Sequence, residues 1–266
     1  MSNIPDTATS FLEYLQKSYR SIGAFEPDFV YIYSDFRYFA RYMEELGGRE
    51  DFCRVIVEPF IKNGQTVIMT TFTYTRQGRF DVLAAPAKLG ALNKWILKQP
   101  GVLRSEHPLF SYAALGPRSD LVLNIGKSAF GCDSIFNRLK NKNAAFLHIG
   151  RPISMGNTII HHIEQYCGAT YRVHKAFKTE VFRGDKYIGT DYTAFVRRSD
   201  VEGENFYFNF TEAANALKNS GIIRSTDNND SFFTISNYDY DAAFLFLRDL
   251  FYKDQALFIK GDFIQY

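Results

Sequence analysis

The chain has 266 residues, of which 46% are hydrophobic, and its formal net charge is +2. A chain of this length and hydrophobicity can bury a large core, so we expect one domain spanning residues 1–266. Charges of both signs are interspersed along the chain, which excludes a strongly basic surface for nucleic acid. Three cysteines without paired ligand spacing indicate neither a disulfide framework nor a zinc site.

No segment of the sequence is typical of targeting or membrane insertion. The first residues lack a basic run followed by an apolar block, and no stretch reaches about eighteen uninterrupted apolar residues. We therefore expect a cytoplasmic protein without a membrane partner. Aromatic residues make up 17% of the chain, which is typical of a bulky core and Tyr-rich strands.

The first half of the chain alternates helical and extended patterns. Apolar side chains recur at helical spacing from residue 7 onward, behind Ser and Thr residues that are candidate helix caps. The patterns predict helices at 7–22, 37–45, 50–61 and 89–98, strands at 27–34, 65–72 and 111–115, and a long loop at 74–88. Two of these strands end in small polar side chains, and ligands bind at such strand ends in open α/β sheets.

In the second half, a buried strand at 144–149 breaks at Gly150 and leads into a helix from residue 157. Ahead of it, Ser134 is a candidate cap for a short helix that includes Leu139. The later patterns predict antiparallel strands at 171–177, 179–182 and 191–197 with a hairpin turn at 183–186, helices at 210–219 and 240–251, and strands at 222–225 and 231–236 around a turn at 228–230.

The helix that starts near residue 157 carries a histidine and a glutamate on one face. His161 and Glu164 are three residues apart, whereas His162 points about a quarter-turn away. A carboxylate beside an imidazole fixes its tautomer and raises its basicity, which a general base requires near neutral pH. His161 and Glu164 are therefore the candidate catalytic dyad, with an ordinary surface pair as the alternative.

A second histidine, His107, precedes Pro108 and is held toward an extended conformation. It is flanked by Arg104 and Ser111, so its imidazole is a candidate to line a cleft. A lone loop histidine more often serves packing, and that alternative stays open.

Several stretches, in order along nearly the whole chain, resemble the aminoglycoside 3-N-acetyltransferase family. The most specific is segment 104–116, RSEHPLFSYAALG, which is similar to the family's Arg-Ser-x-His-Pro-x-x-Ser-x-Ala-Ala-x-Gly. Supporting matches are the SAFG stretch at 128–131 and segment 157–164, which fits Asn-Thr-x-x-His-x-x-Glu. Weaker matches are YSDF at 33–36, where the family often has His-Ser-Ser-Leu, and TTFT at 70–73, where it has Pro-Thr-Phe-Thr.

The resemblance implies an α/β fold with a central mixed sheet flanked by helices, acetyl-CoA as the acyl donor, and the primary amine of a sugar as the acceptor. It implies that His161 is the general base, that Glu164 orients it, and that His107 acts at the edge of the site. For Arg104, a salt bridge that braces its loop is an equal alternative to a phosphate contact. The residues expected to contact the cofactor are Ser34, Asp35, Phe36, Thr71, Phe72, Thr73, Arg104, Ser105, Ser111 and Thr158.

The chain departs from the family pattern at several positions. Tyr33 stands in place of the usual His, Asp35 of Ser and Thr70 of Pro, and Arg151-Pro152 follow a glycine where small residues are usual. Binding a polycationic drug favours an acidic cleft, whereas this chain has a slight excess of positive charge. We therefore expect an amino sugar with its own negative charge, such as a nucleotide-linked amino-deoxy sugar for surface polysaccharide synthesis. An aminoglycoside acceptor, with antibiotic resistance as the role, is the alternative.

Three other hypotheses compete. Cys167 with a nearby histidine would make a thiol hydrolase, although nothing near it in sequence favours a thiolate. A metal hydrolase would use His107, His161, His162 and Glu164, although the two adjacent histidines point to different faces. The family fold would also suit a non-catalytic ligand-binding protein. We expect no metal and no partner beyond the two substrates and, at most, a second copy in a homodimer.

Overall fold

The computed structural model describes residues 7–198, 205–227 and 232–262. Its α-helices are α1 (Ala8–Ser21), α2 (Ala40–Glu45), α3 (Arg49–Lys62), α4 (Ala91–Ile96), α5 (Ile135–Leu139), α6 (Ile159–Cys167), α7 (Thr211–Asn219) and α8 (Tyr240–Lys253). Its strands are β1 (Phe29–Ser34), β2 (Thr66–Thr70), β3 (Gln77–Asp81), β4 (Leu103–Arg104), β5 (Tyr112–Leu115), β6 (Ala144–Ile149), β7 (Arg172–Ala176), β8 (Lys178–Arg183), β9 (Lys186–Gly189), β10 (Thr193–Arg197), β11 (Asn205–Phe208), β12 (Ile223–Ser225), β13 (Ile235–Asp239) and β14 (Ile259–Asp262). Short 3-10 helices are η1 (Arg37–Phe39), η2 (Ser119–Val122) and η3 (Ile153–Met155).

The centre of the molecule is a seven-stranded mixed sheet with the strand order β12-β13-β6-β1-β2-β5-β4. Its three middle strands, β6, β1 and β2, are parallel, and antiparallel strands extend it on both sides. This arrangement is the α/β fold with a central mixed sheet that the family resemblance implied.

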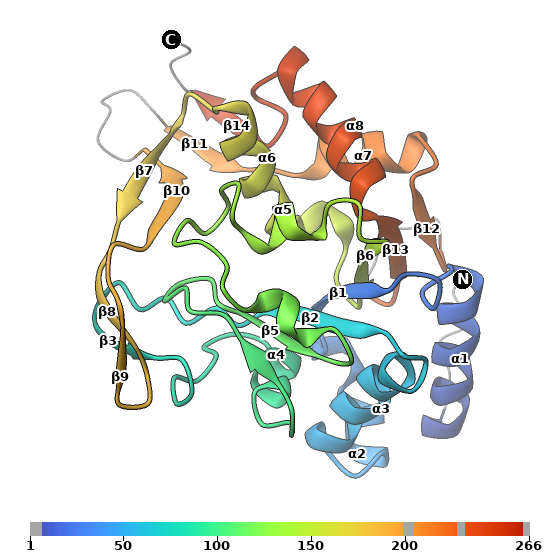
Figure 1. Ribbon diagram of the computed structural model, residues 1–266. Coiled ribbons are helices and arrows are strands. Elements are labelled where there is room, and N and C mark those ends of the chain that lie inside the picture. Colours follow the sequence, from blue (N-terminus) through green and yellow to red (C-terminus); the bar gives the residue numbers. More distant parts are fainter. Residues whose placement is uncertain (1–6, 199–204, 228–231, 263–266) are drawn as a thin grey trace.

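The sheet separates two hydrophobic cores because successive side chains of a strand point to opposite faces. On β1, Val30 and Ile32 point into the core formed with α1 to α4, whereas Tyr31 and Tyr33 point into the core formed with α5 to α8. Figure 1 shows the two helix layers on opposite sides of the sheet. A strand that is buried on both faces has few polar positions, which explains its nearly continuous apolar sequence.

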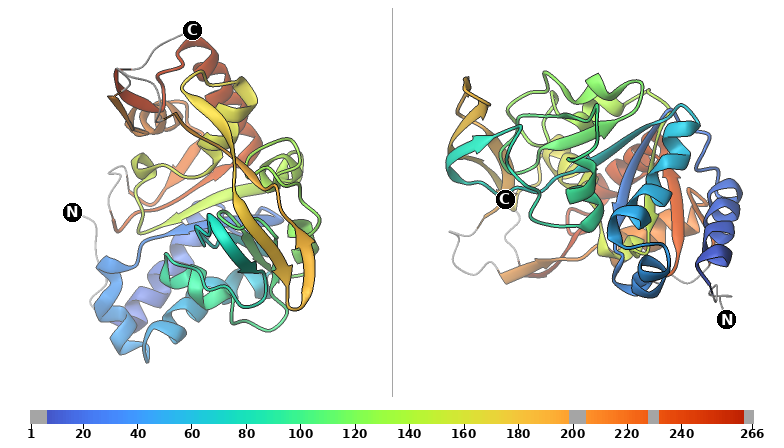
Figure 2. Two further views of the ribbon diagram at one scale, coloured as in Figure 1. Left: turned by 90° about the vertical axis from the view of Figure 1, so that its left-hand side faces the viewer. Right: turned by 90° about the horizontal axis from the view of Figure 1, so that it is seen from below.

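A smaller sheet of β3, β8 and β9 and a two-stranded ribbon of β7 and β10 lie along one edge of the molecule (Figures 1 and 2). The loop predicted at 74–88 is wrong in part, because it contains β3. This strand pairs in parallel with β8 and buries Phe80 and Val82 against Val181 and Tyr192. A strand of five residues whose partner lies about a hundred positions later leaves little local signal.

Most other predicted elements are confirmed within a few residues, and Thr7 caps α1 as expected by accepting a hydrogen bond from the Ser10 backbone. Two expectations are wrong. Ser134 stands at the start of α5, but its hydroxyl makes no capping bond. The predicted strand at 231–236 is β13, which lies three to four residues further along, and the turn predicted at 228–230 lies outside the described residues. Strands β11 and β14, which pair with each other, were not predicted at all.

Candidate active site

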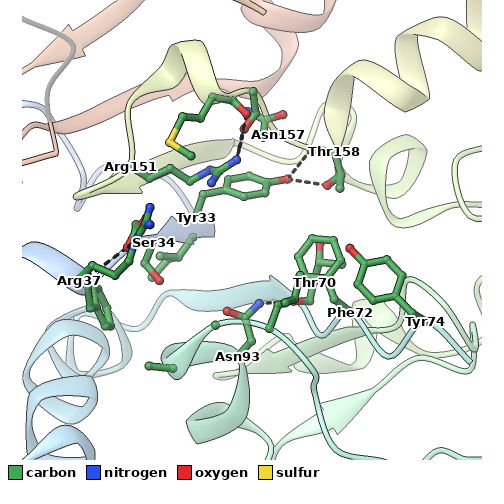
Figure 3. Close-up of a pocket in the computed structure, with 18 of the residues that line it drawn as sticks. Tyr33, Ser34, Arg37, Thr70, Phe72, Tyr74, Asn93, Arg151, Asn157 and Thr158 are labelled. Carbon is green, nitrogen blue, oxygen red and sulfur yellow. Dashed lines mark hydrogen bonds and ion pairs between the residues drawn. The ribbon is translucent and has the colours of Figure 1, made fainter. Parts of the chain in front are cut away.

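A cavity of about 740 Å³ opens where the carboxyl ends of β1 and β2 meet the connection from β6 to α6. Figure 3 shows Tyr33 and Asn157 on one wall, with Asn93 and Phe72 facing them from the other. Backbone loops that follow parallel strands converge at this edge, which is where α/β folds bind ligands. Six of the predicted site residues line the cavity: Ser34, Asp35, Phe36, Phe72, Thr158 and His161.

The predicted dyad is formed at the end of this cavity. The Nδ1 atom of His161 lies 2.8 Å from Oε2 of Glu164. The His161 side chain is 25% exposed and lines the cavity, whereas the Glu164 side chain is fully buried behind it. Phe130 and Phe208 pack against the imidazole at ring-centroid distances of 5.2 and 6.1 Å. The ring is therefore held in one orientation between a carboxylate and two aromatic faces.

Two residues that the sequence did not single out complete the surroundings of Glu164. The Tyr171 hydroxyl donates a hydrogen bond of 2.9 Å to Oε1, and the Arg172 Nε lies 2.7 Å from Oε2. Arg172 also approaches the imidazole, because its guanidinium nitrogen lies 3.1 Å from Nδ1 of His161. Both residues come from the start of β7, directly after the loop that follows α6.

These contacts assign the tautomer of His161. An ionised carboxylate has no proton to give, so the close contact between Nδ1 and Glu164 requires a proton on Nδ1. The approach of Arg172 to the same nitrogen is longer, at 3.1 Å, and cannot also be a hydrogen bond to that protonated atom. The lone pair of the neutral ring therefore lies on Nε2, which is the arrangement of a general base.

The electrostatics agree with an ionised carboxylate and a neutral imidazole. Burial lowers the pKa of His161, the charge of Arg172 lowers it further, and the bond to Glu164 opposes both. Burial alone would raise the pKa of Glu164, but Arg172 and His161 more than offset it, so this pKa lies below its usual value. At neutral pH the imidazole is thus free to accept a proton.

His107 does not line the cavity, contrary to expectation. It is 1% exposed, its Nε2 donates to the Thr193 carbonyl, and its Nδ1 accepts from the backbone N–H groups of Leu109 and Phe110 at 3.2 Å. Burial lowers the pKa of His107 to about 4, so the ring is neutral. With both nitrogens engaged, His107 ties its own loop to the start of β10 and has no atom left for a substrate.

The residues around His107 form a buried network behind the cavity wall, which we call the His107 cluster: Thr71, Thr73, Arg104, Ser105, His107 and Ser111. The Thr71 hydroxyl contacts Ser111 Oγ at 2.6 Å, and Arg104 donates from Nε to the same oxygen. Arg104 also donates to the carbonyls of Val82 and Ala85, so it braces a loop rather than reaching the cavity. None of these six residues lines the cavity, and their geometry fits support of the wall in place of the expected cofactor contacts.

Comparison with known proteins identifies the family. The model of the family described as aminoglycoside 3-N-acetyltransferase matches residues 47–238. The chain belongs to this family. It is accordingly an acetyl-CoA-dependent N-acetyltransferase. No curated protein shows significant sequence similarity to it.

Solved structures of aminoglycoside acetyltransferases share the fold. The apoenzyme of AAC(3)-IVa superimposes with a TM-score of 0.70 at 18% identity, covering 93% of this chain and 90% of that one. AAC-VIa bound to sisomicin gives 0.68 at 18% identity, with 93% and 97% covered. AAC-IIIb in a binary complex with CoASH gives 0.68 at 18% identity, with 93% of each chain covered.

Within this acetyltransferase fold, the rival site hypotheses lose their geometric basis. The His162 ring is buried on the other side of α6, where Nδ1 donates to the Phe130 carbonyl, and burial lowers its pKa to about 4. The pKa of the Cys167 thiol is raised by burial, and Cys167 does not line the cavity. Among residues 7–198, 205–227 and 232–262, no group of three His, Cys, Asp or Glu side chains is placed to hold a metal ion. In the same ranges, no helix has the length and apolar character needed to cross a bilayer.

Tyr33, which replaces the usual family histidine, fixes the start of α6. Its hydroxyl contacts Thr158 Oγ1 at 2.7 Å and accepts from the Thr158 backbone N–H, a pair of contacts visible in Figure 3. Asn157 is bonded to Tyr238 and to His148 of the sheet. Side chains from β1, β6 and β13 thus clamp the turn that presents His161 to the cavity.

Proposed function

We propose that the enzyme transfers an acetyl group from acetyl-CoA to the primary amine of an amino sugar that carries negative charge. A nucleotide-linked amino-deoxy sugar for surface polysaccharide synthesis is such an acceptor. The observation that carries the proposal is the His161–Glu164 dyad opening on a cavity whose charged lining residues are three arginines and one aspartate: Arg37, Arg49, Arg151 and Asp35.

In the proposed reaction His161 is the general base and no acyl-enzyme forms. Nε2 of His161 takes a proton from the attacking amine as its nitrogen bonds to the thioester carbonyl carbon. The tetrahedral intermediate then collapses, the carbon–sulfur bond breaks, and the CoA thiolate leaves with the proton returned from the imidazolium. Glu164 holds the ring and stabilises its positive charge during this cycle.

Polar and aromatic groups at the strand ends would receive the pantetheine arm of the cofactor. Ser34 and Phe36 follow β1 and Phe72 follows β2, and all three line the cavity. The ring of Phe72 stacks with Tyr74 at 5.7 Å, which gives one side of the cavity an apolar surface. Such a surface suits the methylene groups of pantetheine, while hydroxyl and backbone groups suit its amides.

Arg151 supports an anionic ligand most directly. Its guanidinium donates to the carbonyls of Met155 and Gly156, its Nε is buried without a hydrogen-bond partner, and no carboxylate of the described residues forms an ion pair with it. Arg37 differs, because Asp35 accepts two-pronged hydrogen bonds from it. A partly buried guanidinium without a carboxylate favours phosphate or carboxylate groups and disfavours a polycation.

Thiol release from acetyl-CoA tests the proposal against three groups of amines: simple amino sugars, nucleotide-linked amino sugars and aminoglycosides. We expect turnover with the nucleotide-linked group and weak or no turnover with aminoglycosides. Preferred turnover of aminoglycosides, the acceptors named for AAC-VIa and its relatives, would instead establish antibiotic modification. Release with no amine at all, in a protein that still binds acetyl-CoA, would leave a non-catalytic ligand-binding member of the family.

The variant Arg151→Met separates the two anionic ligands, because CoA carries phosphates of its own. It keeps the length of the side chain and removes the charge. We expect the KM for the acceptor to rise by about 10-fold or more, since a charge-assisted hydrogen bond contributes about 1.5–3 kcal/mol. A rise confined to the KM for acetyl-CoA would place the cofactor there and remove this support for an anionic acceptor. Arg54→Met, which removes an exposed arginine outside the cavity, is the matched control.

A further inference from the structure

Glu164 is a fully buried carboxylate that accepts contacts from three groups. Oε2 faces both His161 Nδ1 at 2.8 Å and Arg172 Nε at 2.7 Å, and Oε1 accepts from the Tyr171 hydroxyl. A carboxylate without water around it becomes protonated unless a cation compensates for the lost hydration. The imidazole is neutral, so Arg172 is the cation that compensates.

Arg172 is itself held in place from two directions. Its side chain is only 10% exposed. NH1 donates to the Phe195 carbonyl of β10 at 3.1 Å, and the guanidinium lies 6.0 Å from the centre of the Tyr171 ring. The β7–β10 ribbon, which the sequence suggested was only a run of strands, therefore delivers a fixed positive charge to the back of the dyad.

The charge of Arg172 acts on the imidazole as well as on the carboxylate. Protonation of His161 places a second positive charge beside a guanidinium nitrogen that is 3.1 Å from Nδ1. The other charged group facing the ring is Glu164, and the neighbouring loop and β11 contribute only the rings of Phe130 and Phe208. The resting state is thus an ion pair of Arg172 with Glu164 beside a neutral ring.

We propose that Arg172 is a positioning residue of this enzyme: it keeps Glu164 ionised and His161 in the proton-accepting form. The inference rests on the proposed role of His161 as general base. Arg172 does not line the cavity, so it has no contact with either substrate in this arrangement.

The test compares Arg172→Gln with Arg172→Lys. Removing the cation makes it harder for the His161–Glu164 pair to lose its proton, whichever of the two carries it. In Arg172→Gln we therefore expect the acid limb of the kcat/KM profile to move up by about 1 to 3 pH units, the usual effect of a close charge. In Arg172→Lys the charge stays, so the limb stays near its original pH, while kcat falls because the two-pronged contact is lost. The KM for acetyl-CoA is expected to stay unchanged in both.

A matched control removes a charge from the same strand. Lys175→Gln lies three residues further along β7, roughly 10 Å away at about 3.3 Å per residue, and its side chain is exposed. We expect no movement of the acid limb in this variant. Thermal unfolding of all three proteins shows which of them keep the fold.

Imidazole titration by NMR separates this inference from the proposed function. The chain has five histidines, and His161→Gln assigns the resonance. A rise in the pKa of His161 in Arg172→Gln supports the inference even if His161 proves not to be the base. An unchanged pKa in folded Arg172→Gln overturns it, whatever the activity, and leaves Arg172 as a purely structural ion pair. If the pKa rises but the kcat/KM profile does not follow, the assignment of His161 as base fails instead.

Discussion

Two histidines of this enzyme sit in conserved-looking motif positions, yet the fold treats them in opposite ways. His161 has one nitrogen on a carboxylate, and its ring lines the cavity. His107 has both nitrogens on backbone groups and is closed off from the cavity. A motif match alone does not separate a catalytic ring from a structural one. The deciding feature is whether the second nitrogen is already satisfied by the protein.

The largest expected effect distinguishes the two rings by turnover. His161→Ala removes the proposed base, so we expect kcat to fall by roughly two to four orders of magnitude, with little change in stability because the side chain is partly exposed. His107→Asn, in which the amide oxygen replaces Nδ1 as acceptor, should change kcat far less than the ~100-fold minimum of a general base. Steady-state thiol release measures both. A near-normal rate for His161→Ala would refute the base assignment.

Acid unfolding is expected to expose the buried rings. Above pH 6.5 His107 and His162 are neutral in both the folded and unfolded states, so they add no pH dependence. Below it the unfolded chain binds protons first, because the folded pKa of each is about 4. Stability should therefore fall between about pH 6.5 and 4, by up to roughly 3 kcal/mol for each ring at 1.36 kcal/mol per pKa unit.

Urea unfolding at several pH values measures this fall. The variant His107→Asn should lose about half of the pH-dependent part, because one of the two rings is gone. An unchanged slope in that variant would show that His107 is protonated in the folded state, which its backbone contacts do not allow.

Removal of the His107 ring is expected to cost stability next. His107→Ala leaves the Leu109 and Phe110 N–H groups and the Thr193 carbonyl without their partner. We expect a loss of about 3 kcal/mol in the free energy of unfolding, because a buried polar group without a partner costs about 1–3 kcal/mol. His107→Asn should recover part of it. Equal losses in the two variants would mean that ring packing, not hydrogen bonding, holds the loop.

The smallest expected effect concerns Ser111, at the centre of the His107 cluster. Ser111→Ala deprives Arg104 Nε and the Thr71 hydroxyl of a common partner. We expect about 1–2 kcal/mol of lost stability at unchanged KM for acetyl-CoA. A clear rise in that KM with an intact fold would return Ser111 to the cofactor site and weaken the contrast between the two histidines.

Local sequence was sufficient for the dyad because its geometry is local. Residues three apart on a helix face the same way, so the contact between His161 and Glu164 followed from their spacing. The same reasoning placed His162 on the opposite side, where the structure has it buried. The strand ends that deliver Ser34 and Phe72 to the cavity were also predicted from short apolar runs followed by polar residues.

Local sequence was insufficient where a partner comes from a distant segment. The carbonyl that occupies His107 belongs to Thr193, which lies 86 positions later, and the spacing of motif residues carries no trace of it. Arg172 lies beyond a helix end and a turn, so its direction depends on how β7 pairs with β10. Arg151 was noticed as a departure from the family, but its unpaired nitrogen appears only once the wall around it is built.

The sequence by itself determined the family, the α/β class and the pairing of imidazole with carboxylate, because motif order and helical periodicity are properties of neighbouring residues. The tertiary structure alone decided which histidine reaches the cavity, which cation stands behind the carboxylate, and which polar side chains are consumed inside the wall. Those outcomes depend on burial and on hydrogen bonds between segments far apart in the chain, and such contacts exist only after folding has brought the segments together.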